Sequence, residues 1–420
     1  MKQMQTVVPL MALAFVWPAI GQTQPPVVPT IPEQSLPEKP AAHIPGEKPV
    51  SLAVDDIAVT IGGFVKIDAI YSDFDRGDAL TANGRDFYVP ASIPVGNARN
   101  DQNSLDAHAK ETRLFIKAST TFADDIKIGT YVELDFLVSP GGGTAAVTNA
   151  YNPALRRAYI TYNSFLVGQD WTTFQNLTAL PEGLDFIGPT EGTVFGRQPM
   201  VRYSWNGWQV ALENPETSLL ARGGASRVLT DDNVLPDVVV RYDLKNNFGN
   251  VSFAALGRQL RSRIQTPATL ASSETAMAGG LSVAGKVNVN WFGAADDLRF
   301  NLTGGTGIGR YVGINTVTDS VVTEDGGLKA IPLFGGYLAF RHVWTPKLRS
   351  TVTASVLNAH NEPELTGAAA TKRVDSYHIN LLYSPVKAVT VGVEALPARR
   401  QSETQQGYLR RLQMSMKYSF

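Results

Sequence analysis

The end of the chain alternates strictly between apolar and polar side chains. The even-numbered positions from Leu412 to Phe420 are Leu, Met, Met, Tyr and Phe, and the odd-numbered positions between them are Gln, Ser, Lys and Ser. As a β-strand, this segment has one apolar and one polar face. A soluble sandwich would turn the apolar face inward, whereas a membrane barrel would turn it towards lipid and the polar face towards a wet lumen. The segment alone leaves both architectures open.

The same alternation begins at Val59 and continues to Tyr71, with Phe64 and Ile70 as exceptions. This predicts a strand at the start of the folded region. Further segments alternate in the same way, at residues 113–122, 126–136, 201–205, 238–242 and 389–394.

The connections between these segments alternate between tight turns and long polar loops. Short turns with suitable turn residues are expected at residues 123–125, 163–164, 206–207, 245–248, 292–296, 345–346 and 384–386. Long loops are expected at residues 73–111, 138–153, 172–197, 214–235, 263–274, 308–329, 359–373 and 397–406. Short periplasmic turns and long outer loops are typical of outer-membrane barrels. We therefore predict an all-β fold, a transmembrane antiparallel β-barrel of about sixteen strands.

Aromatic side chains on the apolar faces favour the membrane barrel, because such barrels carry aromatic girdles at both membrane interfaces. Ordinary strand aromatics would explain any one of them, but not the set. They are Tyr71, Phe136, Tyr162, Trp205, Trp208, Trp344, Tyr383, Tyr418 and Phe420.

The N-terminal part is expected to lie outside the barrel. Residues 1–21 have a basic start, an apolar stretch and small residues before Gln22, which is typical of a secretory signal peptide. Residues 22–57 begin with a proline-rich stretch without periodic apolar residues, which predicts an extended periplasmic tether. The barrel is then expected at residues 58–420. No later apolar run reaches the roughly 18 residues of a transmembrane helix.

Composition excludes several functions. Lys and Arg total 37 against 38 Asp and Glu, a net charge of −1, which gives no argument for a nucleic-acid partner. The chain has no cysteine, so disulfides and thiolate metal sites are excluded. None of the five histidines lies near a nucleophile motif or in a zinc-binding spacing. We therefore predict a protein that is not an enzyme and that binds no cofactor or metal.

Several stretches resemble the DcaP-like family of outer-membrane porins. They are Gly63–Tyr71, Arg156–Tyr162, Val167–Phe174, Leu180–Phe186 and Phe195–Tyr203. The resemblance implies a homotrimer of sixteen-stranded barrels in the outer membrane of a Gram-negative bacterium, which admits small anionic solutes such as dicarboxylates. The family often carries a coiled-coil-like N-terminal segment, and the proline-rich start of this chain departs from that pattern.

Arginines recur on the polar face of the predicted strands. Arginine stays charged and pairs bidentately with carboxylates, so a set of arginines in a narrow pore would favour anions. Lumen acids are also predicted at Asp68, Glu133, Asp135 and Glu394, and each arginine could simply be a partner of such an acid. The predicted pore-lining arginines are Arg113, Arg157, Arg202, Arg241, Arg258, Arg341 and Arg349.

Residues 172–197 are the expected constriction loop, folded into the lumen. They mix apolar side chains with the charged Glu182, Asp185 and Arg197, and apolar groups would be buried against the barrel wall. An outer lid or a trimer contact is the alternative role.

The predicted function is that of a porin for passive diffusion of small, preferably anionic solutes. A general non-selective diffusion porin and a surface-exposed β-barrel adhesin without transport are the alternatives. The expected partners are outer-membrane lipid and lipopolysaccharide, and the barrel-assembly machinery, which would recognise the C-terminal strand.

Overall fold

The computed structural model describes residues 50–54, 57–78, 84–122, 125–137, 148–224, 226–263, 274–289, 291–293 and 295–420. All of them belong to one compact unit, 39–420. The predicted signal peptide, the proline-rich stretch at 22–49, the turn residues 123–124 and the loop residues 138–147 and 264–273 lie outside the described residues.

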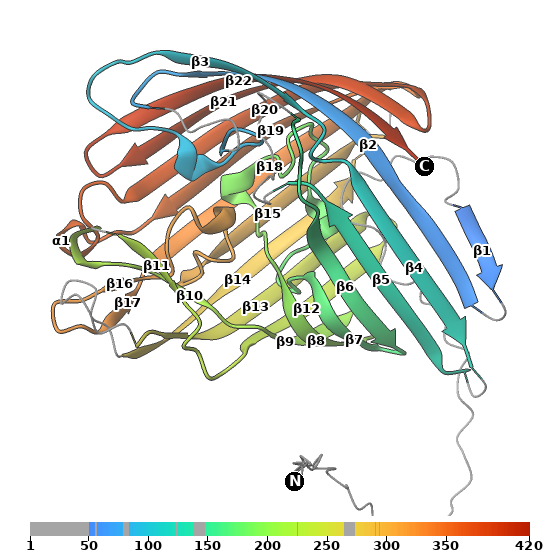
Figure 1. Cartoon of the computed structure of the whole chain (residues 1–420), viewed down its shortest axis with the longest axis horizontal. Coiled ribbons are helices and arrows are strands. Elements are labelled where there is room, and N and C mark those ends of the chain that lie inside the picture. Colours follow the sequence, from blue (N-terminus) through green and yellow to red (C-terminus); the bar gives the residue numbers. More distant parts are fainter. Residues whose placement is uncertain are drawn as a thin grey trace, which may run out of the picture. The chain divides into compact units, whose positions relative to one another are not determined.

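A closed antiparallel barrel of sixteen strands forms the body of this unit, as predicted (Figure 1). The last strand pairs with the first, from Phe64 opposite Ser419 to Phe74 opposite Leu409, and this pairing closes the ring. The strands are β2 (Ile57–Phe74), β4 (Arg113–Thr121), β5 (Lys127–Asp135), β6 (Ala154–Tyr162), β7 (Phe165–Trp171), β8 (Arg197–Trp205), β9 (Trp208–Glu213), β12 (Asp237–Asn246), β13 (Gly249–Arg261), β14 (Thr275–Asn288), β15 (Asp297–Thr306), β18 (Pro332–Thr345), β19 (Leu348–Ala359), β20 (Thr371–Val386), β21 (Val389–Ser402) and β22 (Gln406–Ser419).

Two further strands of this sheet pair with β2. β3 (Gln102–His108) pairs with residues 68–74 of β2, and β4 pairs with residues 58–64, so β3 and β4 form one interrupted strand. On the other side of β2, β1 (Val50–Val54) pairs with residues 57–61. The tether predicted at 22–57 therefore contains a strand near its end. Its alternating Val-Ser-Leu-Ala-Val sequence carries the strand signal, which the preceding prolines obscured.

Turns and loops separate to opposite ends of the barrel, with the loop end on the left of Figure 1. Asn163–Ser164 and Asn206–Gly207 form two-residue turns, and both asparagines have positive φ, as primed hairpin turns require. Three predicted connections are wrong. The predicted loop 73–111 contains β3, which pairs with residues 68–74 of β2. Residues 384–386 belong to β20, and the turn follows at 387–388; residues 397–402 belong to β21, which leaves a loop of only 403–405. Pro397 fits in the strand because it has no backbone N–H, and the pairing of β21 with β20 skips it, passing from Ala395 opposite Ile379 to Ala398 opposite Ser376.

The loops at the other end carry their own structure. β10 (Thr217–Leu220), β11 (Arg227–Thr230), β16 (Ser320–Val322) and β17 (Leu328–Ala330) form a four-stranded sheet. The short helix α1 (Pro363–Thr366) precedes β20. The 3-10 turns are η2 (Pro90–Ser92), η4 (Leu177–Ala179), η5 (Thr190–Gly192), η6 (Arg222–Gly224), η7 (Trp291–Gly293) and η8 (Gly313–Asn315).

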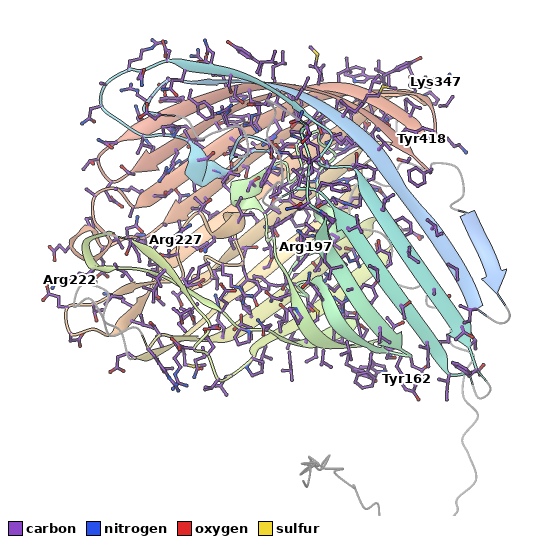
Figure 2. All side chains as sticks on the ribbon, viewed as in Figure 1. Tyr162, Arg197, Arg222, Arg227, Lys347 and Tyr418 are labelled. Atoms are coloured by element: carbon purple, nitrogen blue, oxygen red, sulfur yellow. The ribbon has the colours of Figure 1, made fainter. Side chains whose placement is uncertain are left out.

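The strand faces follow the predicted alternation. Outward residues such as Ile67 and Met416 are more than half exposed, whereas inward Asp68 and Gln413 are buried. Eight of the nine predicted girdle aromatics are exposed, Phe136 being the exception. Tyr162 and Tyr418 lie at the short-turn end in Figure 2. Among the described residues, no helix has the length and hydropathy to cross a membrane.

Candidate functional site

The loop between β7 and β8 lies inside the ring of strands and crosses the lumen, as predicted (Figure 1). Its first part follows the wall formed by β12 to β18. Asn176 donates from its side-chain amide to Asn250 Oδ1 at 2.8 Å, the Tyr337 hydroxyl donates to the Ala179 carbonyl at 3.0 Å, and Arg299 donates to the Leu180 carbonyl at 2.6 Å.

The second part of this loop reaches the wall formed by β20, β21, β22 and β2. The backbone N–H of Leu184 donates to Glu394 Oε2 at 2.8 Å, and the Leu184 carbonyl accepts hydrogen bonds from Gln413 at 3.0 Å and from Lys66 at 2.6 Å. Close packing fixes the end of the loop, because a Cβ on Gly192 would lie 2.3 Å from the Gly336 carbonyl oxygen. The loop is therefore anchored around most of the lumen.

Glu182 is the main ionic anchor of the constriction loop. Its two carboxylate oxygens accept hydrogen bonds from Arg349 Nε at 2.8 Å and Nη2 at 2.7 Å, and Arg341 lies 3.9 Å away. Burial raises the pKa of the Glu182 carboxyl, but hydrogen bonds from Arg349 and the charges of Arg349 and Arg341 outweigh this, so the pKa lies below its ordinary value. Two predicted pore arginines therefore hold the loop.

Asp185 and Glu191 are buried polar anchors rather than solute contacts. Asp185 accepts a hydrogen bond from the Tyr88 backbone N–H at 2.7 Å and lies 3.7 Å from Arg411. Glu191 accepts from the Ser376 hydroxyl at 2.6 Å. Burial raises the pKa of the Glu191 carboxyl above its ordinary value.

Two predicted arginines share one acid on the wall from β6 to β8. Arg157 Nε and Arg202 Nη2 lie 2.6 Å and 2.7 Å from opposite oxygens of Asp170. The Arg157 guanidinium also lies over the stacked rings of Tyr131 and Tyr159, at 4.6 Å and 5.3 Å. Two cations thus meet one carboxylate, and the local charge of this group is +1.

Three of the predicted pore arginines are more exposed than the acids that pair with them, whereas in the Lys66–Glu111 pair the acid is the more exposed side chain, at 14% against 6%. Arg113 lies 3.3 Å from Asp135, and their side chains are 16% and 1% exposed. Arg341 lies 2.6 Å from Asp297, and their side chains are 23% and 1% exposed. Arg241 covers Asp243 in the same way at 2.6 Å.

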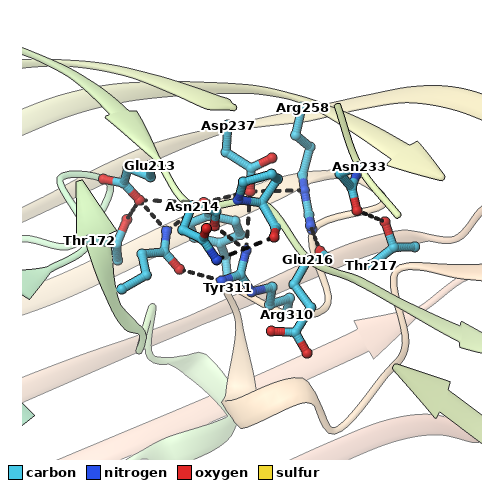
Figure 3. A network of polar contacts seen from close by, with 12 residues as sticks. Thr172, Glu213, Asn214, Glu216, Thr217, Asn233, Asp237, Arg258, Arg310 and Tyr311 are labelled. Carbon is cyan, nitrogen blue, oxygen red and sulfur yellow. Dashed lines mark hydrogen bonds and ion pairs between the residues drawn. The ribbon is translucent and has the colours of Figure 1, made fainter. Parts of the chain in front are cut away.

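Arg258 does not line the open lumen, although its side chain points inward as its position in the strand predicts. It is 1% exposed and pairs with Asp319 at 2.8 Å. It also lies 3.4 Å from Asp237 (Figure 3). Tyr311, in the loop between β15 and β18, lies over its guanidinium at 5.3 Å and donates to Asp237 at 2.8 Å. Arg258 therefore anchors this loop against the wall.

Arg197 and Lys417 are lumen cations that make no ion pair with an acid in the part of the chain that the structure describes. Arg197, the first residue of β8, has its guanidinium 5.0 Å from the Trp171 ring. Lys417 of β22 lies 5.5 Å from the Phe64 ring. Sequence reasoning did not select Lys417, although its polar position in the terminal alternation was the signal for it.

A cavity of about 130 Å³ separates the constriction loop from the wall. Arg156, also not selected from the sequence, lines it and pairs with Glu133 at 2.8 Å, because a register shift at β5 and β6 turns both Arg156 and Arg157 inward. Four basic and three acidic residues line the cavity: Lys66, Arg113, Arg156 and Lys417, and Glu111, Glu182 and Asp185. Among the described residues, no group of three or more His, Asp or Glu could hold a metal ion.

Comparisons with known proteins agree with a channel. The chain is similar to the outer membrane channel DcaP of Acinetobacter baumannii, with a TM-score of 0.69 and 22% identity over 89% of this chain and 99% of that one. It shares the fold of OmpT of Vibrio cholerae (TM-score 0.53, 10% identity, covering 88% and 100% of the two chains) and of Salmonella typhi OmpF (0.52, 11%, 88% and 100%).

No curated protein sequence matches the chain. The family model described as DcaP outer membrane protein matches residues 41–420. The chain therefore belongs to the DcaP outer membrane protein family and is an outer-membrane channel protein of a Gram-negative bacterium.

Proposed function

We propose that this channel passes small anionic solutes, such as dicarboxylates, passively down their concentration gradient. The observation that carries the proposal is that, in two ion pairs of the lumen wall, the arginine lies nearer the passage than its acid. Arg113 and Arg341 reach towards the passage, and their partners Asp135 and Asp297 lie almost fully buried behind them. A solute therefore meets the guanidinium groups first.

This arrangement favours anions although the whole chain has a net charge of −1. The barrier in a narrow pore depends on the charges nearest the ion, because the low-dielectric wall focuses their field. Arg197 and Lys417 add two lumen cations that make no ion pair with any described acid. Paired arginines keep N–H donors that can bind a carboxylate.

The general diffusion porin is the second candidate, because every predicted pore arginine has an acidic partner at 4 Å or less. Full compensation would leave a pore without preference. The two candidates differ in one measurable quantity, the reversal potential in a potassium chloride gradient.

Purified wild-type protein in a planar bilayer tests the proposal. We expect a reversal potential that corresponds to chloride preference, and faster flux of succinate than of its neutral analogue succinamide into liposomes. Equal permeability of the two ions would favour the general porin, and potassium preference would refute the proposal. The proposal includes the homotrimer that the family resemblance implies, and the expected contacts with outer-membrane lipid and lipopolysaccharide. Chemical cross-linking of the membrane-embedded protein tests the trimer.

A further inference from the structure

A second cavity, of about 220 Å³, lies at the loop end of the barrel, away from the constriction. Its walls come from five different loops and strand ends, including Ala91, Thr316, Asn361 and Thr371. Two of its lining side chains are charged, and both are arginines: Arg227 of β11 and Arg400 of β21. No acidic side chain is among its described lining residues.

Arg400 is held so that part of its guanidinium stays available. Its Nε donates to the Thr371 hydroxyl at 3.0 Å, and its Nη1 donates to the carbonyls of Ala91 at 2.8 Å and Ile93 at 3.0 Å. These neutral acceptors fix the orientation of the side chain but leave its charge uncompensated. Arg400 is half-buried and lies on the inward face of β21, as do Ala398 and Ser402.

Arg227 approaches the same cavity from the outer four-stranded sheet. It is exposed, and its Nη2 donates to the Thr316 carbonyl at 3.3 Å. Figure 2 shows Arg227 at the loop end of the barrel. Among the described residues, neither Arg227 nor Arg400 makes an ion pair. Two acids lie near the lining, and both have other partners: Asp319 acts on Arg227 through its charge but pairs with Arg258 at 2.8 Å, and Glu403 accepts from Asn361 at 3.1 Å and pairs with Lys372 at 3.2 Å.

The seven predicted pore arginines differ from Arg227 and Arg400, because each of them has an acidic partner. Two arginines that line one cavity without a carboxylate repel each other, and a bound anion would relieve this repulsion. The cavity is smaller than the roughly 300–1,000 Å³ of sites for drug-sized ligands. It therefore suits a small oxyanion rather than a larger molecule.

We propose that Arg227 and Arg400 form an anion-capture site at the outer entrance of the channel, which binds a small carboxylate before it reaches the constriction. The inward position of Arg400 directs the site towards the lumen, so the ligand is a free solute rather than a lipid headgroup. The Asn361 and Thr318 side chains lie along the same wall as further polar contacts. This inference rests on the proposed anion transport and names where the solute first binds.

The test records current blockages by succinate in a planar bilayer, with succinate added to the loop side or to the turn side of the oriented full-length protein. In the R227Q/R400Q variant, we expect the association rate from the loop side to fall about tenfold, the lower end of electrostatic effects on association. The rate from the turn side should stay unchanged. R227Q alone loses only the hydrogen bond to Thr316 and keeps the contacts of Arg400 with the loops. It should therefore give a smaller decrease in the loop-side association rate.

The matched control is R222Q. Arg222 lies at the same end of the barrel in Figure 2, pairs with Glu324 and does not line the cavity. An unchanged loop-side rate in the double variant, or an equal decrease in R222Q, would refute a discrete site. The reversal potential of the wild type without succinate reports on anion selectivity itself, so failure of the site and failure of the proposed function give different results.

Discussion

Arg349 of β19 holds Glu182 of the constriction loop in a bidentate pair, with Nε–Oε2 and Nη2–Oε1 distances of 2.8 Å and 2.7 Å. The two residues are 167 positions apart, and their pairing fixes the loop across the lumen from the strand where it begins. An arginine expected to select solutes thus also holds the constriction loop.

The first prediction concerns this pair. In E182Q, the loop loses its ionic anchor and Arg349 loses its acid, and breaking a buried pair costs about 3–5 kcal/mol. We expect the loop to leave the wall part of the time, so single-channel recordings at pH 7 should show larger and noisier conductance. The control E403Q changes a glutamate at the outer rim and should behave like the wild type. Quiet, wild-type conductance in E182Q would contradict the anchoring role.

The same pair predicts the response to acid. The pKa of Glu182 in the folded channel lies below the ordinary 4.5, so the anchor is complete at neutral pH and is lost as the pH falls through the lowered pKa. Wild-type recordings should therefore stay quiet at pH 4.5 and become noisy only in stronger acid. E182Q should be noisy throughout this range. Noise that begins in the wild type above pH 4.5 would show that another group controls the loop.

The sequence predicted the parts of the barrel that depend on local pattern. The alternation from Val59 to Tyr71 predicted β2, and Asn206–Gly207 predicted the hairpin of β8 and β9, because both signals lie within a few residues. Arg258 shows where this stops. The position of Arg258 in its strand directs the side chain inward, but the Tyr311 ring covers it. Tyr311 lies 53 positions further along the chain, and a contact between residues so far apart in sequence leaves no local pattern. The register shift that turns Arg156 inward is likewise a property of paired strands.

A further prediction concerns the group of Arg157, Arg202 and Asp170. Replacing all three by neutral residues of similar size, R157Q/R202Q/D170N, removes a net charge of +1 from the lumen wall without leaving a buried carboxylate unpaired. We expect the ratio of chloride to potassium permeability to fall by roughly two- to fivefold. R410Q also removes one positive charge, but from an exposed outward position, and should leave the ratio unchanged. If R410Q lowered the permeability ratio as much as the triple variant, the selectivity would depend on the net charge of the protein and not on this group.

Closure of the barrel depends on its last residue. The Phe420 backbone N–H donates to the Gly63 carbonyl, and the Gly63 N–H donates to the Phe420 carbonyl, both at 3.1 Å. Deleting Phe420 removes two backbone hydrogen bonds of about 0.5–1.5 kcal/mol each, together with an exposed interfacial ring. We expect a several-fold lower yield of heat-modifiable protein in the outer membrane. F420A keeps the backbone pair, so an intermediate yield would separate strand pairing from recognition of the aromatic ring by the assembly machinery.

The N-terminal segment provides the last prediction, because its two parts differ. β1 pairs with β2 from Val50 opposite Ile61 to Val54 opposite Ile57, where β22 no longer covers this edge. Removing residues 22–49 keeps β1, and we expect unchanged conductance and resistance to urea, as for a simple extended leader. Removing residues 22–56 leaves the start of β2 with unpaired backbone groups at a strand edge, which invite other strands. This longer deletion should therefore unfold at lower urea concentration and aggregate during refolding. Equal stability of the two deletions would show that β1 contributes nothing to the barrel, whereas destabilisation by the shorter deletion would assign a structural role to the proline-rich stretch.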